Sequence, residues 1–77
     1  MVTASDLQTW LNDAGVQASW VSPLEEAGAF LVYLTAIKGA SPLLQVEKMK
    51  QMPEMLAVEK RNTDYIYRVK VVTGSPD

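Results

Sequence analysis

Residues 55–72, MLAVEKRNTDYIYRVKVV, contain two alternating stretches separated by a short polar connection. We expect residues 55–60 and 65–73 to form two antiparallel strands joined by a turn over residues 61–64. Alternation places two sets of side chains on opposite faces of the second strand: Tyr65, Tyr67, Val69, Val71 and Thr73, against Ile66, Arg68, Lys70 and Val72. One face therefore suits a protein core, and the other is more polar.

The first helix and strand are expected at the start of the chain. Ser5 and Gln8 have the spacing of a capping box, and apolar residues recur with helical period until Gly15, at Leu7, Trp10, Leu11 and Ala14. A glycine at that place commonly ends an α-helix, because it readily adopts the left-handed backbone conformation. Residues 16–21 then predict a half-buried strand ending before Pro23, with one face carrying Val16, Ala18 and Trp20.

The middle of the chain predicts a central strand and a second helix. Residues 29–37, AFLVYLTAI, are apolar at both parities, as in a strand buried on two faces, and a partner is one way to cover the second face. Ser41 and Pro42 open a helix over residues 42–52, which Pro53 ends. Its methionines suit core packing better than an adaptable binding surface.

This order of elements predicts an α+β fold and one domain. We expect a two-layer sandwich over residues 1–77, in the order α-β-β-α-β-β, with both helices on one face of a four-stranded, mostly antiparallel sheet and a flexible tail over residues 74–77. A ferredoxin-like fold, or a circular permutation of it, has this composition of elements.

Composition removes several kinds of chemistry. The chain has no histidine and no cysteine, so it lacks the commonest general base, thiolate nucleophiles and the commonest zinc ligands. Glu25 and Glu26 are adjacent carboxylates suited to magnesium beside a phosphate, but a solvated loop is the simpler interpretation. We expect no enzyme, no metal site and no cofactor.

Charge and hydropathy bear on partners and location. A net charge of −2 gives no field that attracts nucleic acid or an anionic membrane. RNA-binding sheets also place aromatic and cationic residues on the same face, whereas Tyr65 and Tyr67 alternate with Arg68 and Lys70. The start of the chain lacks the pattern of a signal peptide, and residues 27–36 are too short an apolar stretch for a membrane helix. We expect a cytoplasmic protein without membrane or nucleic-acid partners.

The chain from residue 29 to 72 resembles the amino-acid-sensing module of the leucine-responsive/AsnC-type regulators and, more loosely, ACT domains. The motifs that carry the likeness are Met52-Pro53-Glu54-Met55, which leads into a strand, and Asp64-Tyr65, which opens the next. The chain departs from the regulator pattern because it lacks a helix-turn-helix, and Asn62-Thr63 stand where a glycine is usual. The resemblance implies ligand sensing or dimerisation.

Two functions remain open from the sequence. The first is a self-associating protein-interaction or regulatory module, such as a mobile-element-encoded modulator of a larger machine, which binds its partner through Tyr65, Tyr67, Arg68 and Lys70. The second, implied by the resemblance, is a sensor of an amino-acid-like ligand held at a subunit interface by Arg61, Asn62, Thr63 and Asp64. Trp10 and Trp20 suit either a core or an interface.

Overall fold

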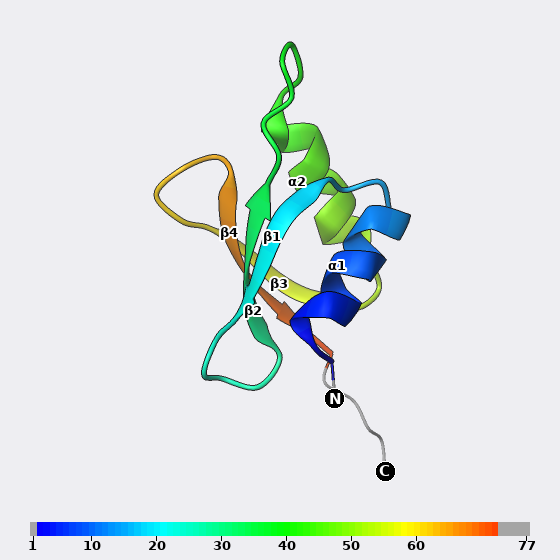
Figure 1. The fold of residues 1–77 in the computed structure, drawn as a ribbon, viewed down its shortest axis with the longest axis vertical. Coiled ribbons are helices and arrows are strands. Elements are labelled where there is room, and N and C mark those ends of the chain that lie inside the picture. The colour runs from blue at the N-terminus through cyan, green and yellow to red at the C-terminus, as the bar shows by residue number, and fades with distance from the viewer. Residues whose placement is uncertain (1, 73–77) are drawn as a thin grey trace.

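The computed structural model describes residues 2–72 (Figure 1). The elements are α1 (Ala4–Asp13), β1 (Ala18–Pro23), β2 (Ala29–Leu34), α2 (Pro42–Gln51), β3 (Met55–Lys60) and β4 (Ile66–Val71). Two helices lie against one face of a four-stranded antiparallel sheet, so the predicted α+β sandwich in the order α-β-β-α-β-β is confirmed.

Helix α1 is capped two residues earlier than the sequence suggested. The Thr3 Oγ1 accepts a hydrogen bond from the Asp6 N–H at 3.0 Å, and the Asp6 carboxylate accepts one from the Thr3 N–H at 3.1 Å. Thr3 therefore forms the capping box, and the expected pairing of Ser5 with Gln8 is wrong. Both spacings fit the pattern, but an acidic residue in the first turn also stabilises the positive end of the helix dipole.

The C-terminus of α1 ends at a left-handed glycine, as predicted. Gly15 has a φ of 85°, a conformation that costs side-chain-bearing residues energy. The Val16 N–H then donates to the Leu11 carbonyl at 2.8 Å and the Gly15 N–H to the Asn12 carbonyl at 3.0 Å. This pair of bonds satisfies two carbonyls at the helix end and turns the chain toward β1.

A bulge in β1 moves Trp20 to the side of the sheet away from the helices. Ala18 pairs with Leu34 but Trp20 pairs with Tyr33, so Ser19 is an extra residue, and its hydroxyl donates to the Tyr33 carbonyl at 3.1 Å. The prediction that Ala18 and Trp20 share a face is therefore wrong, because the inserted residue reverses the alternation. The strand also continues through Pro23, which the edge position of β1 tolerates.

The other boundaries differ little from expectation. Strand β2 stops at Leu34, three residues before the predicted end, and α2 ends one residue early, at Gln51. The predicted bounds of β3 are confirmed. Strand β4 runs over Ile66–Val71, and the predicted tail at residues 74–77, like Thr73, lies outside the described residues.

The sheet has the strand order β1-β2-β4-β3, with β2 and β4 at its centre. Strands β2 and β3 are both antiparallel to β4, so they run parallel to each other and are connected through α2 across the face of β4. This split β-α-β unit is compatible with a ferredoxin-like fold, and β1 follows the first helix where a permuted version would have it.

The core lies between the helices and one face of the sheet. Side chains of both helices, of three strands and of two connecting segments meet there: Leu7, Leu11, Val16, Ala18, Val21, Phe30, Val32, Leu34, Val46, Met49, Met52, Tyr67, Val69 and Val71. Trp10 packs against this cluster from α1. Met49 and Met52 are buried, in agreement with core packing. Over residues 2–72, neither helix has the length and apolarity needed to cross a bilayer.

We expect Leu11→Ala to lower the free energy of unfolding by about 2–5 kcal/mol, because Leu11 is fully buried and its removal leaves a cavity. Urea unfolding followed by circular dichroism measures this loss. The matched control is Leu44→Ala on α2, where the side chain is 64% exposed and the expected change is within about 0.5 kcal/mol. Equal losses in the two variants would contradict the position of the core.

Candidate interaction surface

The face of the sheet opposite the helices, here called the open face, is organised in rows that cross the strands. The first row joins Trp20, Tyr33 and Ile66, which are neighbours in the strand register. The central row contains Ser22, Leu31, Arg68 and Glu59, and the third contains Ala29, Lys70 and Ala57. Aromatic and aliphatic groups thus concentrate at one end of the open face and charged groups at its centre.

The first row is apolar and accessible. Trp20 is 62% exposed, and Tyr33 and Ile66 are half-buried. Leu31, in the central row, is also half-buried. Both helices lie on the other side of the sheet (Figure 1), so within residues 2–72 this strip faces outward. The prediction that β2 is a central strand is confirmed. Its second face belongs to the open face and is only half-buried at Leu31 and Tyr33, so the expected burial of both faces is not seen within residues 2–72.

A carboxylate from the loop between β1 and β2 joins the two cations of β4. Glu26 Oε1 accepts from Arg68 Nη2 at 2.7 Å, and Glu26 Oε2 forms an ion pair with Lys70 Nζ. Arg68 and Lys70 are two residues apart on one strand, so both side chains emerge on the open face. One loop carboxylate therefore neutralises part of a doubly positive site.

The same ion pairs change the ionisation of Glu26. Hydrogen bonds from Lys70 and then from Arg68, together with their positive charges, lower the pKa of Glu26 below its ordinary value of 4.5. The Glu26 side chain remains half exposed, at 51%, so solvent screens this cluster. It orders the loop against β4 more than it stabilises the fold.

The four residues predicted to bind a partner do not lie together. Arg68 and Lys70 share the open face, whereas Tyr67 is buried in the core with 3% exposure and Tyr65 packs against the core from the same side. Burial is the main cause of the raised pKa of the Tyr67 hydroxyl, and the nearby charge of Asp64 adds to it. Only the cationic pair is therefore placed to meet a partner on the open face.

The turn proposed for ligand binding forms a solvated connection. Arg61, Asn62, Thr63 and Asp64 are all exposed. The Thr63 Oγ1 accepts from the Tyr65 N–H at 2.8 Å, and Asp64 pairs with Lys60 at 2.6 Å, which raises the pKa of that lysine. These contacts shape the turn, and they occupy two of the polar groups that a ligand would use.

Comparison with protein-family models, with curated proteins and with solved structures finds no match. These searches do not bear on the resemblance to the AsnC-type and ACT modules. That resemblance stays an expectation drawn from the sequence motifs.

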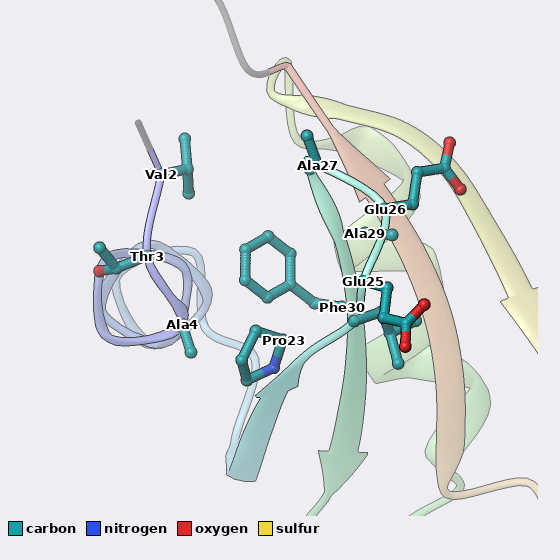
Figure 2. A pocket seen from close by; sticks show the side chains of 11 residues that line it. Val2, Thr3, Ala4, Pro23, Glu25, Glu26, Ala27, Ala29 and Phe30 are labelled. Carbon is teal, nitrogen blue, oxygen red and sulfur yellow. The ribbon is translucent and has the colours of Figure 1, made fainter.

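A hollow of about 640 Å³ lies at the opposite end of the sheet from the turn of residues 61–64, between the start of α1 and the loop that connects β1 to β2. Apolar side chains provide most of its wall, among them Val2, Ala4, Pro23 and Phe30. Figure 2 shows the Phe30 ring directed into it and the carboxylates of Glu25 and Glu26 pointing away. It therefore offers apolar contact but no acid or base to a bound molecule.

Two features of the open face were not predicted from the sequence: the exposure of Trp20 and the ion pairs of Glu26. The exposure of Trp20 depends on the bulge at Ser19, for which the sequence has no glycine or other marker. Glu26 meets cations 42 and 44 residues away, a contact that requires the register of β2 and β4. Among residues 2–72 the acidic side chains form no cluster of three or more suited to a metal ion, and Glu26 is already paired with cations.

We expect a carbon-13 NMR titration to place the pKa of the Glu26 carboxyl below 4.5 in the folded chain. A lowered pKa means that the ion pairs stabilise the fold above the pKa of the unfolded chain, and that this stabilisation disappears as the pH falls through the folded value. Lys70→Gln should move the midpoint back toward 4.5, because the largest contribution comes from Lys70. A midpoint that ignores this substitution contradicts the pairing.

Proposed function

We propose that this protein is a small non-enzymatic interaction module that self-associates through the open face of its sheet. The observation that carries the proposal is the apolar row of Trp20, Tyr33 and Ile66 on the side of the sheet away from both helices. Contiguous apolar groups of this kind mark interaction sites more often than solvent-facing surface. Aromatic groups also supply much contact area at low entropic cost.

The size of the chain supports association. A 77-residue chain hides only about 60% of the surface that it exposes when unfolded, so its own core is small. Leu31 and Tyr33 are apolar residues of β2 on the open face, and burying them against a partner would add hydrophobic stabilisation to the folded chain. A second copy presents the same surface, which makes a two-fold dimer the simplest partner.

The open face is small enough to make the dimer weak. Four strands at about 4.8 Å spacing and six residues at about 3.3 Å each span roughly 400 Å² per copy. This is at the low end of specific interfaces, where complexes are transient. Weak and reversible association suits a regulatory module whose subunits exchange, rather than a permanent structural subunit.

The residue content supports a binding role. The chain lacks histidine and cysteine, and Glu26, Arg68 and Lys70 on the open face hold one another in ion pairs. No nucleophile and base are brought together on this face within residues 2–72. The exposed polar turn of residues 61–64 favours no second function.

We expect Trp20→Asp to weaken self-association strongly, because it places a charge in the apolar row. Sedimentation velocity from about 1 μM to 1 mM protein covers the range in which a weak dimer forms. The matched control is Leu44→Asp, which makes the same change at an equally exposed apolar residue of α2, on the helix side of the sheet. The control should dimerise as the wild type does.

Circular dichroism and urea unfolding should show that both variants remain folded, since neither side chain belongs to the core. A wild-type chain that stays monomeric over the whole range overturns the proposal. So does a dimer that Leu44→Asp disrupts as strongly as Trp20→Asp, because the contact would then not be specific to the open face.

A further inference from the structure

In a two-fold dimer formed through the open face, the centre of the face in one copy lies against the same centre in the other copy. In a two-fold dimer, a residue near the axis meets its own counterpart. The middle of the open face is where Leu31 of β2 and Arg68 of β4 stand opposite each other in the central row. A dimer whose axis passes through this row places two copies of Arg68 close together, with the two copies of Lys70 one row away.

Four cations so close would oppose association. Like charges brought together at an interface repel, and the repulsion grows as water is removed between them. Each copy meets this difficulty with two carboxylates: Glu26, which bridges Arg68 and Lys70, and Glu59, which is the register neighbour of Arg68 on β3. The charges on each open face then balance, two positive against two negative.

We infer that Glu26 determines the partner of the open face: it makes the face compatible with a second copy of this chain and excludes acidic partners. The inference rests on the proposed function, because it assigns the partner of the same surface. Glu26 is the decisive carboxylate because one of its oxygens meets each cation, at 2.7 Å for Arg68.

The exclusion of acidic partners follows from the same geometry. Arg68 and Lys70, two residues apart on a strand with side chains about one-third exposed, would by themselves suit a carboxylate-rich peptide. Glu26 occupies that position from within the chain. An external carboxylate must compete with a tethered one, whose effective concentration is in the millimolar range for a short connection.

The test compares Glu26→Gln with Glu25→Gln in sedimentation experiments on the full chain. Both substitutions replace a glutamate by glutamine, so they change the net charge equally. Glu25 is the control because it is adjacent and exposed but forms no ion pair among the described residues. We expect Glu26→Gln to raise the dimer dissociation constant by about tenfold or more, as loss of one partner in a charge cluster does. Glu25→Gln should leave the dissociation constant within about twofold of the wild type.

A triple variant tests whether Glu26→Gln acts through the unbalanced charge of Arg68 and Lys70 or through the altered side chain at position 26. Adding Arg68→Gln and Lys70→Gln to Glu26→Gln removes the unbalanced cations, and dimerisation should return toward the wild-type level. A second arm titrates each chain with a hexaglutamate peptide and measures binding by isothermal titration calorimetry. Glu26→Gln should bind this peptide at least about tenfold more tightly than the wild type, because both cations become available.

The outcomes distinguish the two proposals. A wild-type monomer overturns the proposed function, and with it this inference. A wild-type dimer that Glu26→Gln weakens no more than Glu25→Gln leaves the proposed function intact and overturns the role of Glu26. Wild-type binding of hexaglutamate as tight as that of Glu26→Gln, or tighter self-association of Glu26→Gln, also overturns it.

Discussion

The antiparallel pairing of β2 with β4 is the constraint on which the rest of the structure depends. These two strands form the centre of the sheet although 31 residues separate Leu34 from Ile66 in the sequence. Their register sets Phe30 beside Val69 and Val32 beside Tyr67 under the helices, and Leu31 beside Arg68 on the open face. A slip of one residue in β4 would bring Arg68 toward the core and expose Val69. The burial of these valines therefore selects both the core and the open face at once.

The helices attach to this sheet through polar contacts as well as apolar ones. The Gln8 side chain donates to the backbone carbonyl of Ala18 at 3.0 Å, and the side-chain Oε1 of Gln45 accepts from the Gln17 N–H at 2.7 Å. These bonds tie α1 and α2 to the start of β1. Because both helices are needed to cover the same apolar surface, neither is left to cover the open face. An exposed apolar row is thus the consequence of a two-layer fold with a sheet that is apolar on both sides.

Charge on the open face follows from the same arrangement. A cationic strand at the centre of a sheet would repel a second copy, and the loop before β2 supplies the carboxylate that balances it. The loop is placed there because it precedes Ala29, the register neighbour of Lys70. The surface is therefore apolar at one end and neutral at its centre. That combination permits self-association without a strong long-range field, in keeping with the small net charge of −2.

The sequence by itself determined the number and order of the elements, the bounds of β3, the capped starts and ends of the helices to within a turn, and the opposed faces of β4. These are local properties, since period-two alternation, glycine conformation and proline position act over a few residues. Only the tertiary structure separated Tyr67 from Arg68 as partner-binding candidates, because alternation puts them on opposite faces of β4 and the helices cover the face of Tyr67. It also decided the exposure of Trp20, through one inserted residue at Ser19, and the pairing of Glu26 with β4. Both depend on strand register, which long-range burial sets and neighbouring residues do not.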